Sequence, residues 1–469
     1  MKYYRLFTWI LFLFIGLLLS CSSNSTNKNQ AVKNNANNTA LPASGIIDQS
    51  CLSDPNISFS YYLPKSYTEG RKYPVLLLFD PHGDAHFAIE KYKSAADKFE
   101  YILMSTNAIK NGLDGETAGH VMQSLLGSLS KQLPVNLTQL YVGGFSGGAR
   151  YAAMLAMSGS GVQGLMVAGA GFTADNWKNL SPSVIIAVGN DGDMNLSEIL
   201  ALNDIQDKDQ RSRVLIMRDK GIHEWPSLDK MQECLAIFTA YAIRDSIESD
   251  KKKLDLILAM YDTLDKSDYC STSPIHKALF YERIVKALAY QKDIDKYGKS
   301  YAVMIQSSSY LSEKKLEQSL VKEESTIKNN YYTAMGTKDT LWWYTEMQKL
   351  NSSIINEKNN FKQAQLMRIR SGLSLMCYMN LDKTMKANSN QDAYYLSVLY
   401  RNIDPDNSEA WFLAAVMEAR SNNKIKAIDF LSTAGKKGFN QRARVNQTTD
   451  FNSLLGDPLF QDAVNKLPN

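Results

Sequence analysis

The segment LTQLYVGGFSGGARYAAMLAMS, residues 137–158, decides the fold of this chain. It passes from an apolar run, typical of a buried strand, directly into a helical pattern. Gly144 lies two residues before Ser146 and Gly147 directly follows it, so the chain can turn sharply here without a Cβ clash. Such a strand-to-helix turn would raise the Ser146 hydroxyl above the end of a sheet, where a nucleophile is accessible.

Apolar runs of strand length lie on both sides of this segment. Five of them are PVLLLFD (74–80), YILMST (101–106), GLMVAGAG (164–171), SVIIAVG (183–189) and RVLIMRD (213–219). They are nearly continuous and are separated by helical patterns, which is typical of parallel strands joined by crossover helices. The earlier run ISFSYYLP (57–64) alternates and predicts a leading antiparallel edge strand. The sequence therefore predicts an α/β fold with a mostly parallel sheet.

A serine on such a turn needs a base, because its hydroxyl is a weak nucleophile until a neighbour accepts its proton. In sheets that carry this turn, the acid and then the histidine follow the serine along the chain. Only His223 and His276 follow Ser146. His276 lies in a helical pattern, which favours a core or surface role, whereas His223 follows the last strand on a loop that opens a helix. We therefore predict His223 as the base.

The acid is expected on the loop after the run 183–189. This loop contains two aspartates, Asp191 and Asp193, separated by one glycine. Either carboxylate could accept the imidazole N–H and stabilise the imidazolium. We predict Asp193 as the acid and keep Asp191 as the alternative, the other aspartate being a turn residue.

An oxyanion hole needs two backbone donors directed at the developing negative charge. Gly147, directly after Ser146, is predicted to supply one, and the loop after PVLLLFD the other, from the N–H of Asp84 or Gly83. His82 and His86 are then loop residues near the pocket. Their spacing would also suit a metal, but no matching cluster of ligands follows, so we expect neither a metal nor another cofactor.

With these motifs, residues 55–243 resemble the esterase branch of the α/β-hydrolase family, close to the polyhydroxybutyrate depolymerase and feruloyl esterase group. The shared features are a Gly-x-Ser-x-Gly-Gly turn and a histidine followed shortly by Trp-Pro. The resemblance implies ester hydrolysis through an acyl-enzyme, with Ser146 as nucleophile, His223 as base and then acid, and Asp193 as the residue that orients it. The acid loop has one residue more than the commoner Gly-x-x-Asp spacing, which keeps the choice of acid open.

The N-terminus predicts export. A short basic start and the apolar run 7–19 form a signal peptide over residues 1–20, too short to span a bilayer comfortably. The run ends Leu-Leu-Ser-Cys and resembles the bacterial lipobox, which implies that Cys21 becomes an acylated N-terminus. Residues 21–45 contain no aromatic side chain and predict a lipidated tether. We expect a lipid-anchored protein of the bacterial outer membrane or cell envelope.

The rest of the chain divides into an α/β-hydrolase domain over 46–245 and an all-α domain over 246–469. Residues 405–439 resemble one tetratricopeptide repeat, with Trp411, Ala415, Ala427, Leu431 and Ala434 at its packing positions and Asn422-Asn423 at the turn. One repeat does not make a stable array, so we predict a helical array with degenerate repeats. Its role is either structural support or the binding of a peptide or protein partner.

These features give a leading hypothesis and two alternatives. The leading one is a lipid-anchored serine esterase whose substrate ester is small or attached to a polysaccharide. The alternatives are an inactive hydrolase-fold surface protein whose helical domain binds a partner, and a serine peptidase. Basic residues are interleaved with acidic ones at a net charge of +4, which argues against nucleic acid. The sequence leaves open whether the cysteines beyond Cys21 form disulfides or buried thiols: Cys51, Cys234, Cys270 and Cys377.

Overall fold

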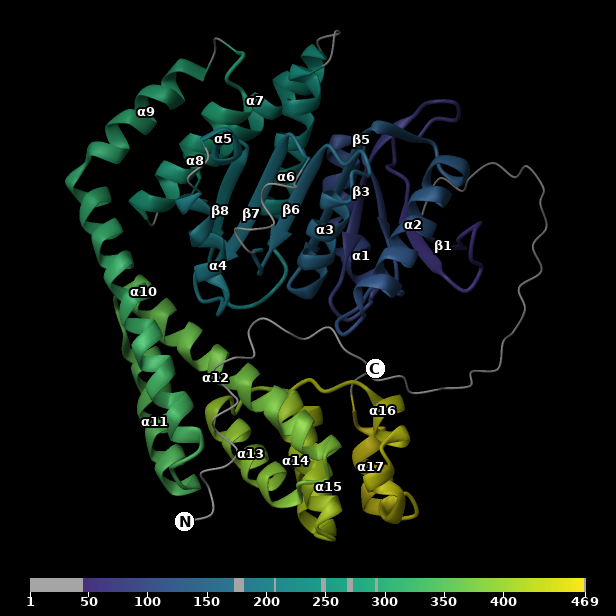
Figure 1. Ribbon diagram of the computed structural model, residues 1–469, viewed down its shortest axis with the longest axis vertical. Helices are drawn as coiled ribbons and strands as arrows, with labels where there is room; N and C mark the ends of the chain where they lie inside the picture. Colours follow the sequence, from purple (N-terminus) through teal and green to yellow (C-terminus); the bar gives the residue numbers. More distant parts are fainter. Residues whose placement is uncertain are drawn as a thin grey trace. The chain divides into compact units, whose positions relative to one another are not determined.

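The computed structural model describes residues 45–172, 181–205, 208–245, 250–267, 273–291 and 294–467. The predicted signal peptide, the tether, its acylated Cys21 and also Cys270 lie outside these residues. Within them, the chain forms an eight-stranded sheet with flanking helices, followed by a helix-rich region (Figure 1). The predicted α/β fold is therefore confirmed.

The sheet has the order β1-β2-β4-β3-β5-β6-β7-β8, and all pairs from β4 to β8 are parallel. Its strands are β1 (Ile46–Ser50), β2 (Ser58–Tyr62), β3 (Tyr73–Phe79), β4 (Ile102–Ser105), β5 (Val135–Phe145), β6 (Gly164–Ala168), β7 (Val184–Asn190) and β8 (Val214–Asp219). β2 is antiparallel to β1 and to β4. The prediction of an edge strand at 57–64 was wrong, because β1, a strand only half-buried along its length, forms that edge.

Alternate side chains of the strands enter two separate cores, as the period of a strand requires. In β3, Leu76 and Leu78 face one core, and Val75 and Leu77 face the other. The first core is covered by α1 (Ala85–Phe99) and α6 (Leu228–Arg244), and the second by α2 (Gly115–Gln132) and α3 (Gly147–Met157). Short helices α4 (Leu196–Leu200) and α5 (Lys208–Ser212) precede β8. Both faces are therefore buried, which explains the nearly continuous apolar runs.

The unit that contains the sheet extends beyond the limit expected at residue 245, because the chain divides into two compact units between Leu316 and Glu317. The sheet unit therefore includes three more helices: α7 (Lys251–Lys266), α8 (Pro274–Ala287) and α9 (Asp295–Gln306). Tyr261 and Phe280 are fully buried in the core that α6 covers. The buried Arg283 guanidinium on α8 donates to the Glu233 carboxylate on α6 at 2.7 and 3.1 Å.

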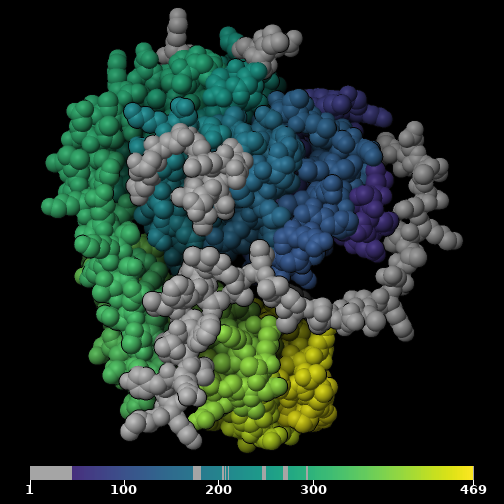
Figure 2. All heavy atoms as spheres, in the orientation of Figure 1, coloured from purple at the N-terminus to yellow at the C-terminus, as the bar shows by residue number. Residues whose placement is uncertain are grey.

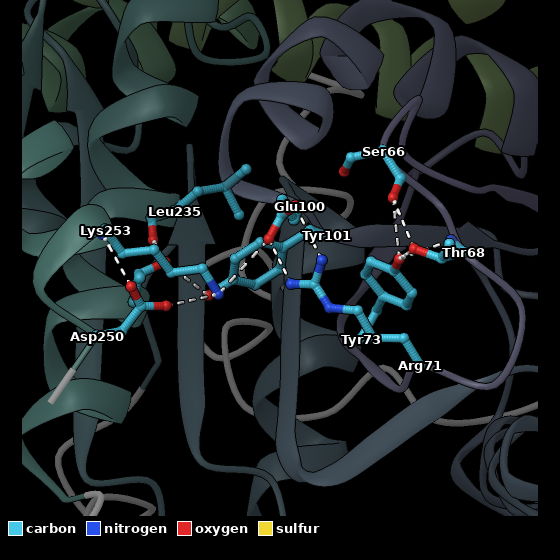
Figure 3. A network of polar contacts seen from close by, with 10 residues as sticks. Ser66, Thr68, Arg71, Tyr73, Glu100, Tyr101, Leu235, Asp250 and Lys253 are labelled. Carbon is cyan, nitrogen blue, oxygen red and sulfur yellow. Dashed lines mark hydrogen bonds and ion pairs between the residues drawn. The ribbon is translucent and has the colours of Figure 1, made fainter. Parts of the chain in front are cut away.

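A polar network also connects α7 to the sheet at the amino ends of β3 and β4. Figure 3 shows Arg71, which precedes β3, beside Glu100, the residue that caps the C-terminus of α1. Lys253 of α7 lies 3.8 Å from the Glu100 carboxylate and 3.5 Å from that of Asp250. The Arg71 guanidinium stacks 4.6 Å from the centre of the Tyr73 ring. All four charged groups of this network therefore have partners of opposite charge.

The second unit is helical throughout its described residues. Its helices are the C-terminal part of α10 (Ser308–Met335), α11 (Thr340–Asn356), α12 (Asn360–Lys386), α13 (Asn390–Ile403), α14 (Ser408–Arg420), α15 (Lys424–Lys436), α16 (Arg442–Gln447) and α17 (Pro458–Asn465). The turn between α14 and α15 is at Asn422-Asn423, as expected, and Asn422 has a φ of 57°. No helix among the described residues is long and apolar enough to cross a bilayer. In the space-filling view the sheet unit is coloured from purple to green and the helical unit from green to yellow (Figure 2).

The cysteines of the described residues are thiols. Cys51 and Cys234 are buried in the sheet unit and Cys377 in the helical unit, and all three are free. Burial raises the pKa of the Cys51 thiol and also raises the pKa of the other two. These thiols therefore behave as small apolar core groups and are poor nucleophiles.

Candidate active site

Ser146 stands on the turn between β5 and α3, in an unusual backbone conformation. Its φ is 52° and its ψ is −121°, outside the regions that side-chain-bearing residues normally occupy. The Ser146 N–H donates to the Ala168 carbonyl at 2.8 Å, which fixes the turn against β6. A Cβ at Gly144 would lie 2.4 Å from the Gly148 backbone, and one at Gly148 would lie 2.0 Å from the Phe79 carbonyl. The two glycines therefore let β5, α3 and β3 approach closely enough to hold the strained serine.

The structure brings together the three residues predicted to react. The Ser146 Oγ lies 2.9 Å from His223 Nε2, and His223 Nδ1 lies 3.0 Å from both carboxylate oxygens of Asp193. The residues follow β5, β8 and β7 respectively, and the carboxyl ends of parallel strands meet at one edge of the sheet. Asp193 is buried, whereas the His223 side chain is 20% exposed, so the array runs from the interior toward solvent.

The carboxylate of Asp193 is held in place by its own loop. The Asn195 N–H donates to Asp193 Oδ1 at 2.8 Å, and the Asn195 side-chain amide donates to the Gly169 carbonyl at 2.9 Å. Gly169 has a φ of 60°, and a Cβ there would lie 3.1 Å from Asp193 Oδ2. A fixed carboxylate facing one imidazole nitrogen sets which tautomer His223 adopts, with the proton on Nδ1.

Asp191, the alternative acid, belongs to a separate ion cluster with Arg218 and His276. Its carboxylate accepts from the Arg218 guanidinium at 2.6 and 2.9 Å and lies 3.2 Å from His276 Nε2. Burial alone would raise the pKa of Asp191, but the charges of Arg218 and His276 outweigh burial and hold this pKa well below its usual range. His276, expected in a core or surface role, thus brings α8 to the acid loop.

His223 is positioned by aromatic contacts and by hydrogen bonds to the backbone carbonyls of its two neighbours. The Phe145 ring lies 4.6 Å from the imidazole and 5.6 Å from the Trp225 ring. Trp225 Nε1 donates to Asp80 Oδ2 at 3.0 Å, which joins the histidine loop to the loop after β3. The Asn190 side-chain amide donates to the Ile222 carbonyl at 2.7 Å. The Trp-Pro segment therefore anchors the loop that carries the histidine.

The loop after β3, predicted to supply an oxyanion donor, is organised around the buried Asp80 instead. The N–H groups of His82 and Asp84 donate to Asp80 Oδ1 at 2.7 and 3.2 Å, and that of Gly83 donates to the Asp80 carbonyl at 3.2 Å. The Asp84 carboxylate caps α1 by accepting from Phe87 N–H. The only local signal for this role of Asp80 is its place directly after a buried strand.

His82 of this loop and His86, which lies in α1 and not on the loop as expected, contact acidic side chains outside the serine array. His82 exposes 83% of its side chain and lies 3.7 Å from Asp80, and His86 Nε2 contacts the Asp48 carboxylate of β1 at 2.7 Å. Gly147 begins α3, so its N–H belongs to the first turn, whose donors have no acceptor within the helix. Of the predicted oxyanion donors, only Gly147 therefore has this helix-terminal position beside Ser146.

Comparisons with known proteins give no family assignment. No protein-family model matches the chain, and no curated protein matches its sequence. Among solved structures, a ferulic acid esterase is 16% identical with a TM-score of 0.35, over 42% of this chain and 97% of its own. A feruloyl esterase module from Clostridium thermocellum is 15% identical with a TM-score of 0.34, over 46% and 94%. An acylaminoacyl peptidase from Pyrococcus horikoshii is 13% identical with a TM-score of 0.30, over 42% of each chain.

Proposed function

We propose that the chain is a serine hydrolase that cleaves carboxylic esters through Ser146, His223 and Asp193. One observation carries this proposal: a continuous hydrogen-bonded array joins the buried Asp193 carboxylate through both imidazole nitrogens to the Ser146 hydroxyl. A nucleophile bonded to a base, which is in turn oriented by an acid, is the arrangement that activates a serine.

In the first half of the reaction, the Ser146 Oγ attacks the ester carbonyl carbon while His223 Nε2 takes the hydroxyl proton. Asp193 accepts from Nδ1–H and stabilises the imidazolium that forms. The tetrahedral intermediate carries its negative charge on the former carbonyl oxygen. Its collapse breaks the bond to the alcohol oxygen, and Nε2–H returns the proton to that oxygen, so an alcohol leaves and an acyl-serine remains.

In the second half, water takes the place of the alcohol. His223 Nε2 removes one proton from the water as its oxygen attacks the acyl carbon, and returns that proton to the Ser146 Oγ as the acyl bond breaks. The sum is one ester and one water converted to one acid and one alcohol. No oxidant, metal or cofactor is needed for this balance.

The substrate class is a proposal from the sequence alone. The proposed substrate is an ester that is either small or attached to a polysaccharide.

The cellular setting is a proposal from the sequence alone. Export, acylation of Cys21 and a tether over 21–45 would place the enzyme on the cell envelope, with the helical unit either supporting it or binding a protein partner. Membrane fractionation of the full-length chain and of Cys21→Ala tests this. We expect the wild type in the membrane fraction and the variant in the soluble one, and equal distribution would contradict the anchor.

A fluorophosphonate probe tests the reaction, because it labels a serine only when a base activates it. The folded wild type should be labelled and should cleave short-chain esters. Ser146→Ala should abolish labelling, and His223→Ala should slow it by orders of magnitude because the residues act as a unit. Ser158→Ala, at the far end of α3, is the matched control and should react as the wild type does.

Two results would contradict the proposal. A folded wild type that neither takes the probe nor cleaves acetyl, butyryl or feruloyl esters would favour the inactive surface protein. Labelling that survives in Ser146→Ala would place the nucleophile elsewhere.

A further inference from the structure

One oxyanion donor, the Gly147 N–H, is predicted beside Ser146, and stabilising a tetrahedral intermediate needs a second. The backbone after β3 is the place where the sequence predicts it. In the structure each N–H from His82 to Ala85 already has an acceptor, and Pro81 has no N–H to offer. The N–H groups of His82 and Asp84 both donate to Asp80 Oδ1, and that of Gly83 donates to the Asp80 carbonyl. The Ala85 N–H donates to Asn107 Oδ1 at 2.9 Å.

Asn111 contacts both the loop after β3 and Gly147. Its backbone N–H donates to the Pro81 carbonyl at 2.8 Å, which fixes it against the loop after β3. Its side-chain amide lies over Gly147, because a Cβ built on that glycine would be 1.7 Å from Asn111 Oδ1 and 3.5 Å from Nδ2. Asn111 therefore contacts both segments from which the oxyanion donors were predicted, the residue after the nucleophile and the loop after β3.

The amide of Asn111 is also available. Asn111 is exposed, and no group among the described residues accepts a hydrogen bond from its Nδ2. An amide has donors on one side and an acceptor on the other, and a half turn about its last bond exchanges them. When negative charge develops beside Gly147, that turn directs an N–H toward it.

We infer that the Asn111 side-chain amide is the second oxyanion donor, together with the Gly147 N–H. This inference rests on the proposed ester hydrolysis and deepens it by adding a catalytic residue. It also explains why residue 147 is glycine: any larger residue would displace the Asn111 amide. The loop after β3 then supports Asn111 through Pro81 and does not itself contact the substrate.

The test compares Asn111→Ala and Asn111→Asp with Asn107→Ala in the full-length protein. Asn107 is the matched control, because it stands on the same loop but its amide oxygen already accepts from Ala85 N–H. We measure kcat and KM for a short-chain ester, the inhibition constant of a trifluoromethyl ketone, and the melting temperature. The ketone probes the site because Ser146 would add to it and form a charged tetrahedral adduct.

Removing the donor should act on the transition state alone. We expect Asn111→Ala to lower kcat by about 10²-fold and to weaken ketone inhibition by a similar factor, as removal of one oxyanion donor does. KM and the melting temperature should stay near the wild-type values. Asn111→Asp keeps the shape, removes the donors and adds a negative charge, so its kcat should fall at least as far. Asn107→Ala should keep kcat within about threefold of the wild type.

Each of the following results would overturn the inference. If Ser146→Ala is inactive but Asn111→Ala keeps its kcat, ester hydrolysis stands and the inference is wrong. A rise in KM alone would make Asn111 a substrate contact, and equal losses of kcat and melting temperature in Asn111→Ala and Asn107→Ala would make it a structural residue; both overturn the inference. An inactive wild type overturns both proposals.

Discussion

The amino ends of the strands, here called the amino edge of the sheet, and their carboxyl ends, the carboxyl edge, each carry a network of charged and polar side chains. The two networks differ in how they end. At the amino ends of the strands, Arg71, Glu100, Lys253 and Asp250 pair with one another and close the network. At the carboxyl ends, the array begins at the buried Asp193 and ends at the Ser146 hydroxyl, which is bonded to His223. A closed network only holds elements together, whereas an array that ends at an activated group can act on a second molecule.

Backbone conformation separates the two edges as well. Glu100 and Ser146 both have positive φ, but Glu100, with φ 59° and ψ 47°, is an ordinary left-handed helix cap. Ser146, with ψ −121°, lies outside that region, and the surrounding glycines hold it there. Strain that the structure maintains at one residue is typical of functional sites. This difference supports the proposal that the reaction takes place at the carboxyl edge and that the amino edge has a structural role.

The largest expected effect is at the acid of the carboxyl edge. Asp193→Asn keeps the shape of the site but lets His223 take the wrong tautomer, so kcat for a short-chain ester should fall by roughly 10⁴-fold. Asp191→Asn, two residues away, should change kcat less than about tenfold, because Asp191 faces Arg218. Steady-state kinetics of both variants decide the matter, and the opposite ranking would move the acid to Asp191.

The intermediate effect concerns stability at this same edge. Asp191→Asn removes a charged partner of Arg218, whose side chain is only 1% exposed, and should cost about 3 kcal/mol of unfolding free energy at pH 7. Because the pKa of Asp191 is lowered in the folded state, its contribution is complete above pH ~4 and is lost as the pH falls below that value. Urea unfolding should show a smaller difference in unfolding free energy between variant and wild type at pH 3 than at pH 7. An equal difference at both pH values would refute this account.

The smallest expected effect is at the amino edge. The Arg71 side chain is 43% exposed, and exposed ion pairs are weak, so Arg71→Ala should lower the unfolding free energy by no more than about 1 kcal/mol and leave kcat unchanged. Lys65→Ala, which removes a more exposed pair with Asp97, serves as the reference. A clear loss of activity in Arg71→Ala would mean that the two edges are coupled, and the comparison would fail.

The fold could be predicted from the sequence because its signals are local. The strand, the glycines around Ser146 and the following helix are contiguous, and each buried strand is a nearly continuous apolar run. The choice between Asp191 and Asp193 could not be made in this way. It depends on Arg218 and His276, which are distant in sequence and meet the loop only in the folded chain.

Two other features lie beyond what a local pattern can indicate. The helical patterns after residue 245 do form helices. Periodicity does not indicate which core a helix joins, so α7 and α8 were expected in the second unit, whereas they pack in the sheet unit. The N–H of Asp84 was expected to face the substrate, but whether a loop N–H is free depends on its neighbours, and here Asp80 accepts it.

The pair between Glu233 and Arg283 has a consequence for the order in which the protein forms during synthesis. Glu233 is fully buried on α6, and its partner follows fifty residues later, on α8. A nascent chain that has emerged only as far as the end of α6 holds every strand of the sheet, yet Glu233 still lacks the Arg283 guanidinium that donates to it in the folded protein. The docked position of α6 is therefore fully stabilised only after Arg283 has been synthesised, and before that point the apolar face of α6 is open to aggregation.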